Sequence, residues 1–177
     1  MDIVLFNPAP RAGKQVQRRV ELPLSLLCTA TPLDRLGYRI RIIDEFANPE
    51  WKQELLDALG ERPICFGVTC MTGPQIWHAL EGCRLVRERH PDVPIVWGGV
   101  HASLMPQQTL THPLVDIVVV GEGEETFLEL VKALESGTPL DRVAGIWHKG
   151  EGGASGTVDH NSSETASILP VLGSESV

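Results

Sequence analysis

The chain has 177 residues, of which 42% are hydrophobic and 21% are charged, and its formal net charge is −8. This size and composition are typical of one globular domain with a sizeable core. The negative charge argues against a nucleic acid or an anionic membrane as a partner, because both attract basic surfaces. No apolar run approaches the roughly 18 residues of a membrane span, and the first residues lack the basic start of a signal peptide, so we expect a cytoplasmic protein.

Short apolar runs alternate with amphipathic segments over the first 148 residues. The second of the predicted strands alternates polar and apolar residues, which is typical of an edge strand. Pro32 should kink or split the first predicted helix. In chain order, the predicted elements are strand 2–6, helix 22–36, strand 39–44, helix 48–59, strand 64–68, helix 76–90, strand 95–97, a short helix 106–110, strand 117–120, helix 124–135 and strand 143–148.

The runs at 95–97 and 117–120 show no polar alternation, which indicates strands covered on both faces. Alternation of such strands with helices predicts an α/β fold. We expect a Rossmann-like or flavodoxin-like doubly wound parallel sheet of five or six strands, in the order 2-1-3-4-5. The composition then changes to Gly, Ser, Thr and Asp, so residues 149–177 are predicted to form a flexible tail or a truncated linker after a domain at 1–148.

Glycine-rich turns end both of these buried strands. Gly98-Gly99-Val100-His101 follows the first strand and Gly121-Glu122-Gly123 follows the second. In a doubly wound sheet the ligand crevice lies at the carboxyl ends of the strands, and glycines there allow a ligand to approach the backbone. The segment Thr69-Cys70-Met71-Thr72 ends the preceding strand and should face the same crevice.

The turn at 121–126 admits three interpretations. It nearly matches the G-x-G-x-x-G dinucleotide fingerprint, but Thr126 replaces the third glycine. Glu122 and the two glutamates after Gly123 would repel a phosphate, although a helix dipole favours carboxylates at this place. The turn is therefore a nucleotide site, a purely structural acidic helix start, or a grip on an uncharged polar ligand edge or a neighbouring domain.

Motifs for metal binding or hydrolysis do not stand out in the sequence. The four cysteines form no C-x-x-C pair, and we expect all of them to be small buried hydrophobes. No H-x-x-x-H or G-x-S-x-G motif is present, so we predict no catalytic residue and no protein metal site. A flavodoxin-type flavin or nucleotide protein is disfavoured because Pro8 and Pro10 have no N–H to offer a phosphate.

Two segments, Gly98–Ser103 (GGVHAS) and Gly121–Phe127 (GEGEETF), resemble the N-terminal cobalamin-binding domain of B12-dependent radical S-adenosylmethionine (SAM) proteins. The likeness extends over about residues 1–148. It implies a Rossmann-like domain that holds cobalamin over the carboxyl ends of its strands, with the nucleotide tail beside the turns at 69–71 and 98–99. The candidate cofactor-binding residues are Pro8, Thr69, Met71, Thr72, Gly98, Gly99, Val100, His101, Gly121, Glu122, Gly123 and Thr126.

The sequence departs from this family in two ways. The D-x-H-x-x-G motif, whose His ligates cobalt in methionine-synthase-like proteins, is replaced by Asn7-Pro8-Ala9-Pro10. The resemblance therefore implies cobalamin bound without a protein His on cobalt. The C-x-x-x-C-x-x-C motif of the catalytic half has no counterpart, so we expect no iron–sulfur cluster in this chain and no catalysis by it alone.

Two functional hypotheses follow. The leading one is the cobalamin-binding module of a radical SAM methyltransferase or cyclase, with cobalamin and a radical SAM catalytic domain or chain as partners. The alternative is a degenerate, cofactor-free docking domain. Intact glycine turns favour the first. The second is favoured because Thr69 and Met71 replace the Ser and Leu of the S-x-L turn that the resemblance to the wider B12-binding fold implies at this place.

Overall fold

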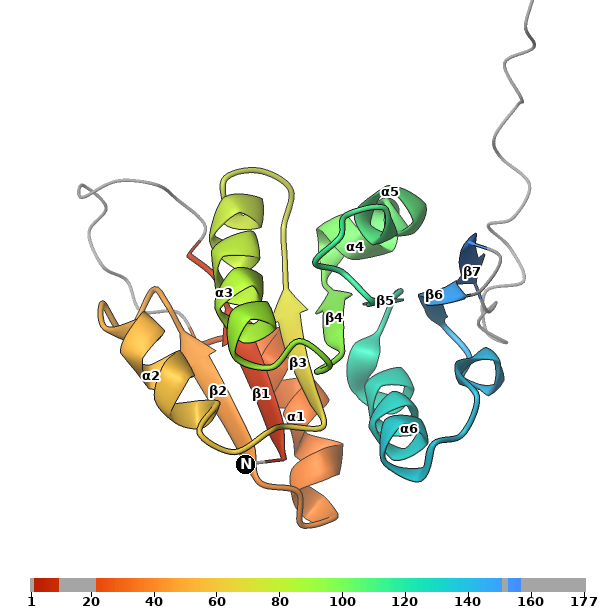
Figure 1. The fold of residues 1–177 in the computed structure, drawn as a ribbon, viewed down its shortest axis with the longest axis horizontal. Coiled ribbons are helices and arrows are strands. Elements are labelled where there is room, and N and C mark those ends of the chain that lie inside the picture. Colours follow the sequence, from red (N-terminus) through yellow and green to blue (C-terminus); the bar gives the residue numbers. More distant parts are fainter. Residues whose placement is uncertain (1, 10–21, 151–152, 157–177) are drawn as a thin grey trace, which may run out of the picture.

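The computed structural model describes residues 2–9, 22–150 and 153–156. In this part of the chain seven strands form one sheet, and helices cover both of its faces (Figure 1). None of the helices in the described segments is long and apolar enough to cross a membrane. The elements are β1 (Ile3–Asn7), α1 (Leu24–Arg35), β2 (Ile40–Asp44), α2 (Trp51–Ala58), β3 (Cys65–Thr69), α3 (Gln75–Arg89), β4 (Ile95–Gly98), α4 (Val100–Leu104), α5 (Pro106–Leu110), β5 (Ile117–Val119), α6 (Gly123–Ser136), η1 (Leu140–Arg142), β6 (Ile146–Gly150) and β7 (Gly153–Gly156).

The strand order is β2-β1-β3-β4-β5-β6-β7, so the predicted order 2-1-3-4-5 is confirmed and β2 lies at the edge, as its alternation indicated. These five strands are parallel. The expected total of five or six strands is wrong, because β6 and β7 add two antiparallel strands. β7 escaped prediction because its sequence, Gly-Ala-Ser-Gly, carries no apolar pattern. The sheet thus continues past residue 148.

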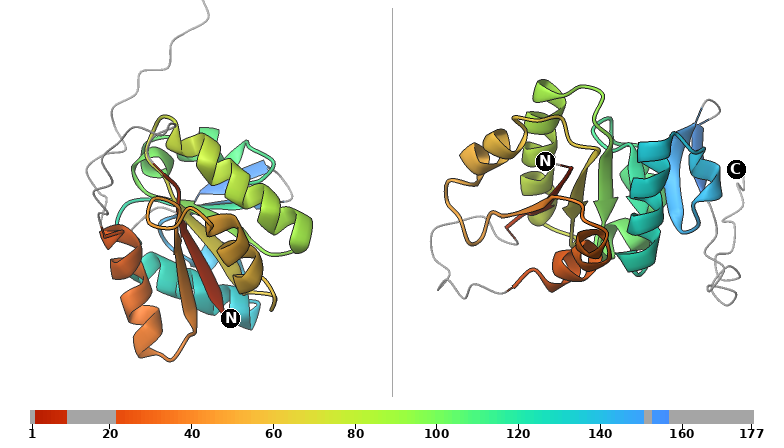
Figure 2. Two further views of the ribbon diagram at one scale, coloured as in Figure 1. Left: turned by 90° about the vertical axis from the view of Figure 1, so that its left-hand side faces the viewer. Right: turned by 90° about the horizontal axis from the view of Figure 1, so that it is seen from below.

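Two helical layers enclose the sheet. α1 and α6 cover one face, and α2 and α3 cover the other (Figure 2). Because successive side chains of a strand point to opposite faces, Leu5 packs toward α1 and α6 while Phe6 packs toward α2 and α3. The Phe6 ring stacks on Trp51 with 4.9 Å between centroids. A Cβ on Gly82 would lie 2.7 Å from Phe6 Cε1, so α3 can approach the sheet only with glycine there.

The first helix is not split at Pro32, since α1 runs unbroken through it and is held by the buried face that includes Leu33. The expectation that all four cysteines are buried is wrong. Cys28 is exposed on α1, whereas the other three cysteines are buried. Burial raises the pKa of the thiols of Cys65, Cys70 and Cys83 to about 12.

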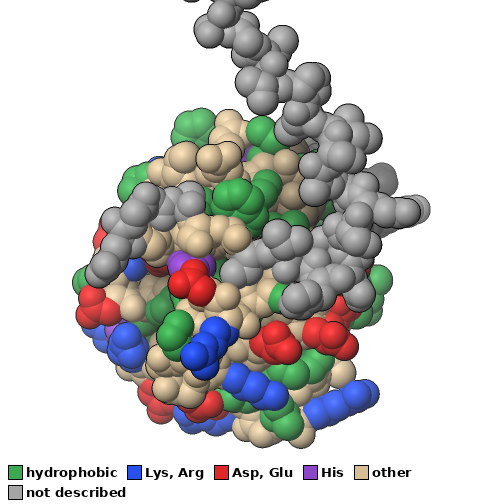
Figure 3. All heavy atoms as spheres, turned by 90° about the vertical axis from the view of Figure 1, so that its right-hand side faces the viewer, with side chains coloured by type: hydrophobic (Ala, Val, Ile, Leu, Met, Phe, Trp, Pro, Cys, Tyr) green, Lys and Arg blue, Asp and Glu red, His purple; other side chains and the backbone are tan. Residues whose placement is uncertain are grey.

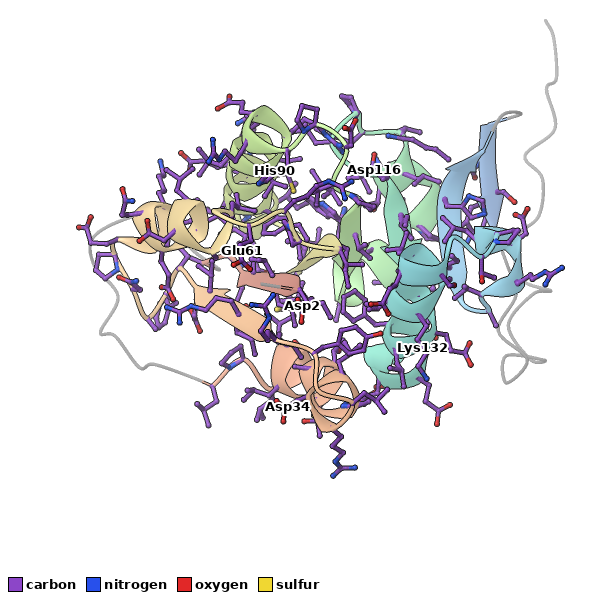
Figure 4. The ribbon with its side chains drawn as sticks, turned by 60° about the horizontal axis from the view of Figure 1, so that its bottom comes forward. Asp2, Asp34, Glu61, His90, Asp116 and Lys132 are labelled. Carbon is purple, nitrogen blue, oxygen red and sulfur yellow. The ribbon has the colours of Figure 1, made fainter. Side chains whose placement is uncertain are left out.

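Ion pairs gather at the amino ends of the strands, where Figure 4 labels Asp2, Glu61 and Asp116. Arg39 bonds to Asp2 at 2.9 Å and to Glu61 at 3.3 Å. The hydrogen bond from Arg39 lowers the pKa of Asp2. Asp116 accepts from Arg87 Nη2 at 2.5 Å and from the Ile95 N–H at 2.8 Å, which fixes the start of β4 beside β5. These ion pairs therefore join segments at the end of the sheet opposite the glycine turns.

The turn after β4 depends on glycine at one position. Gly99 has φ +86°, and a Cβ there would lie 2.9 Å from both the backbone N and the backbone O of Cys70. The neighbouring Gly98 has no positive φ, and a Cβ there would meet nothing within 4 Å. Gly99 is therefore required by the backbone, whereas Gly98 leaves open space in front of it.

We predict that Gly99→Ala lowers the free energy of unfolding by about 1–3 kcal/mol, because it combines a left-handed conformation with a backbone clash. Gly98→Ala should change it by less than about 0.5 kcal/mol. Urea denaturation of the two variants beside the wild type measures both values. Equal stability of the two variants would contradict this account of the turn.

Candidate functional site

A cavity of about 130 Å³ opens at the carboxyl ends of the central strands, between α1, α6 and the sheet. Its floor consists of hydrocarbon side chains that include Leu5, Val96, Val119 and Phe127. Gly67 completes the floor, since a Cβ there would lie 2.7 Å from Leu5 Cδ2 and 3.5 Å from Phe127 Cζ. The floor is therefore apolar and closely packed, which suits an aromatic ligand group.

The two glycine turns form the rim of this cavity. Gly98, Gly99 and the segment 121–124 all line it. Gly121 has φ +79°, a Cβ there would meet nothing within 4 Å, and its N–H donates to Ser103 Oγ at 3.0 Å. The open space in front of Gly98 and Gly121 is thus the space of the cavity itself. A ligand can lie directly against the backbone at these two positions.

Hydroxyl groups stand above the apolar floor. Thr69 from β3 lines the cavity, and so do Ser25 and Thr29 from α1. Thr29 Oγ1 donates to the backbone oxygen of Ser25 at 2.9 Å, which leaves its lone pairs to accept a bond. A Cβ on Gly123 would lie 3.3 Å from the same Thr29 oxygen, so α6 and α1 meet closely here. Thr69, Ser25 and Thr29 therefore offer a ligand neutral donors and acceptors.

The structure brings together half of the predicted site residues. The ones that line the cavity are Thr69, Gly98, Gly99, Gly121, Glu122 and Gly123. Glu122 and Glu124 lie at its acidic end, where the helix dipole of α6 favours carboxylates, so a phosphate group of a ligand would have to lie away from this end.

The other predicted residues lie outside the cavity. Met71 and Val100 are 59% and 57% exposed beside it. Thr72 Oγ1 and His101 Nδ1 share a hydrogen bond of 3.1 Å, which joins the turns after β3 and β4. Pro8 is buried after β1, and Thr126 is buried within α6.

Sequence reasoning missed the contribution of α1. Ser25, Leu26 and Thr29 all line the cavity. Residues four apart share one face of a helix, so the paired hydroxyls of Ser25 and Thr29 were a usable signal. Phe127 belongs to the hydrophobic core and also forms part of the floor of the cavity. In the described segments, no three His, Cys, Asp or Glu side chains are grouped so that they could hold a metal ion.

Comparison with known proteins identifies the family. Residues 18–131 match the model of the B12 binding domain. The chain is 32% identical over 151 residues to the anaerobic magnesium-protoporphyrin IX monomethyl ester cyclase of Synechocystis, a match that covers 82% of this chain and 30% of the cyclase. It is 32% identical to the tryptophan 2-C-methyltransferase of Streptomyces laurentii over 68% of this chain and 22% of that enzyme.

A solved structure agrees with these matches. The radical SAM methyltransferase TsrM from Kitasatospora setae, with cobalamin and a [4Fe-4S] cluster bound, superposes with a TM-score of 0.74 and 25% identity over 90% of this chain and 29% of that one. The present chain thus spans less than a third of the length of these three relatives. Together with the glycine turns and the cavity, the matches show that the chain belongs to the family of B12-binding domains.

Proposed function

We propose that this chain is the cobalamin-binding module of a radical SAM system and that the nucleotide tail of cobalamin occupies the cavity between α1 and α6. The cavity is the observation that carries the proposal. It lies at the carboxyl ends of parallel strands, which is where doubly wound sheets bind ligands, and two glycine turns leave its rim open.

The residues present fit this cofactor. The apolar floor around Phe127 and Gly67 suits a flat aromatic base, and the Thr69 hydroxyl above it can bond to a polar atom of the tail. The open space at Gly98 and Gly121 accommodates a group that side chains would displace. Glu122 at the mouth supports the interpretation of this turn as a grip on an uncharged, amide-bearing ligand edge, since a carboxylate accepts hydrogen bonds from amides.

The reaction belongs to a larger assembly. Bound cobalamin would supply a transferable methyl group or support a related radical rearrangement. The residues of this chain would bind the cofactor, orient it and exclude water. The similarity to enzymes named as methyltransferases and as a cyclase, each more than three times as long as the aligned segment, supports a radical SAM catalytic part as partner, in the same chain or in another.

An apolar surface beside the cavity suits such a partner. Met71, Val100 and Leu104 follow the carboxyl ends of β3 and β4 and are 59%, 57% and 71% exposed. Charged side chains gather in the lower part of the face drawn in Figure 3, whereas its upper part, where Figure 1 places α4 and α5, shows mainly hydrophobic and uncharged groups. Exposed apolar groups at one edge are typical of a surface that another domain covers.

We predict that the purified chain retains about one equivalent of hydroxocobalamin after mixing and desalting, as measured by its corrin absorbance. Gly98→Leu should lower retention at least about tenfold, because its side chain fills the cavity without backbone strain. Glu88→Leu places the same side chain on an exposed position of α3 and is the matched control, which should bind as the wild type does.

The outcomes separate the two functional hypotheses. A wild-type chain that stays colourless, yet unfolds cooperatively, would contradict cobalamin binding and support the cofactor-free docking domain. Retention that is equal in Gly98→Leu and Glu88→Leu would place the cofactor outside this cavity.

The proposal includes cobalt without a histidine ligand from this chain. His101 is tied to the preceding turn, since its Nδ1 shares a hydrogen bond with Thr72 and its backbone N–H donates to the Cys70 oxygen at 3.0 Å. We predict that His101→Ala leaves the cobalt absorption bands of the bound cofactor unchanged and weakens binding less than about tenfold. Thr72→Val, which removes the bond partner of the ring, is the control. A displaced cobalt spectrum in His101→Ala alone would show that the ring ligates the metal.

A further inference from the structure

One peptide group after β1 is held from both sides. The side chain of Gln75, the first residue of α3, is 7% exposed, and its Nε2 donates to the carbonyl oxygen of Pro8 at 2.6 Å. The N–H of the same peptide, that of Ala9, donates to Glu45 Oε2 at 2.8 Å. A rotation of this peptide would break both bonds, so its orientation is fixed.

The two anchors are themselves connected. Glu45 Oε1 lies 2.7 Å from His78 Nδ1, and His78 stands one turn after Gln75 on α3. The side chains of Glu45 and His78 are 11% and 24% exposed, so this contact is largely screened from water. The start of α3 therefore holds the segment after β1 in two ways. Gln75 bonds to it directly, and His78 bonds to Glu45, which in turn bonds to Ala9.

Gln75 also reaches the turn after β3. Its Oε1 accepts a hydrogen bond from the Met71 N–H at 2.6 Å. The adjoining Cys70 donates through its N–H to the Gly98 oxygen at 3.0 Å and accepts from the His101 N–H at 3.0 Å. Gly99 packs directly against the Cys70 backbone. A continuous set of contacts thus runs from Pro8 through Gln75 and residues 70–71 to the glycine turn that lines the cavity.

We propose that Gln75 is a positioning residue for the cofactor: its buried amide holds the turns after β1 and β3 in the arrangement that keeps the Gly98–Gly99 rim in place. This inference rests on the proposed binding of cobalamin at that rim. The hydrogen-bond partners of the Gln75 side chain, Pro8 and Met71, do not line the cavity, so we infer that Gln75 acts through Met71 and Cys70. Both polar atoms of the amide form hydrogen bonds. The Met71 N–H can only donate and the Pro8 carbonyl oxygen can only accept.

Substitutions at Gln75 can separate the effect of these hydrogen bonds from the effect of side-chain packing. Gln75→Leu fills a similar volume and leaves the Pro8 oxygen and the Met71 N–H without a partner. Gln75→Glu still accepts from Met71, but its ionised carboxylate faces the Pro8 oxygen. When protonated it donates to that oxygen and restores both bonds. Burial raises the pKa of a carboxyl, so the neutral form is reached in mildly acidic solution.

Other ionisable side chains lie around the turn. They are Asp44 at the end of β2, Glu45 directly after it, His78 on α3 and His101 on α4. The wild type contains all of them, so its behaviour at each pH is the reference for each variant. Gln53→Glu, on an exposed position of α2, adds the same carboxyl far from the turn and is the matched control.

The experiment measures how fast bound hydroxocobalamin is released after the complex is diluted into an excess of cofactor-free buffer at about pH 8 and about pH 5. We expect Gln75→Glu to release the cofactor about tenfold faster than the wild type at the higher pH and within about twofold of it at the lower pH. Gln75→Leu should release it faster at both pH values, and Gln53→Glu should match the wild type. Thermal unfolding of each apoprotein shows that the variants are folded.

The possible results distinguish the role of Gln75 from the binding of cobalamin itself. Release from both Gln75 variants at the wild-type rate would overturn the role of Gln75 while leaving cobalamin binding intact. Fast release from Gln75→Glu at both pH values would also overturn it, because a protonated carboxyl should restore the bonds. If Gln75→Leu does not fold, the pH rescue of Gln75→Glu still carries the test. A wild-type chain that retains no corrin overturns the proposed function and this inference together.

Discussion

Helices cover both faces of the central strands β1, β3 and β4, and this burial determines where a ligand can reach the sheet. Leu5 and Phe6 point to opposite faces and are both fully enclosed. Each of these strands also pairs with a neighbouring strand on both sides, so access remains at their ends. The amino ends are closed by ion pairs such as that of Arg87 with Asp116. The carboxyl ends carry glycine turns, hydroxyls and the cavity.

The two ends therefore use different chemistry. Ion pairs at the amino ends fix the strands in register, and exposed pairs of this kind add little stability each. At the carboxyl ends, most side chains that line the cavity are neutral. Hydrogen bonds of the buried Gln75 amide hold the turns beside it. Such a surface suits the proposed cofactor, cobalamin, which brings amides, an aromatic base and its own metal. It needs shape and hydrogen bonds more than a cluster of protein charges.

Local patterns predicted much of this arrangement. The strand order, the edge position of β2 and the two glycine turns could be read from the sequence, because apolar periodicity and glycine act within a few residues. Half of the candidate site residues line the cavity for the same reason. The cofactor roles of all twelve, the boundary at residue 148 and the cytoplasmic location remain predictions.

The missed features depend on contacts between distant segments. The wall that α1 gives to the cavity arises from its packing beside α6, about a hundred residues later in the chain. The hold on the Pro8–Ala9 peptide joins residues 8, 45 and 75, none of which is unusual in its own segment. β7 pairs with β6, but its sequence, Gly-Ala-Ser-Gly, has no apolar alternation from which a strand could be predicted.

The central claim is that the cavity between α1 and α6 receives the nucleotide tail of cobalamin. A crystal structure of the chain grown with hydroxocobalamin tests it most directly. The account predicts difference density for the tail against Phe127 and Gly67, with a polar atom of the tail at the Thr69 hydroxyl. Density for the corrin with its tail outside this cavity, or an ordered corrin on another surface, would contradict it.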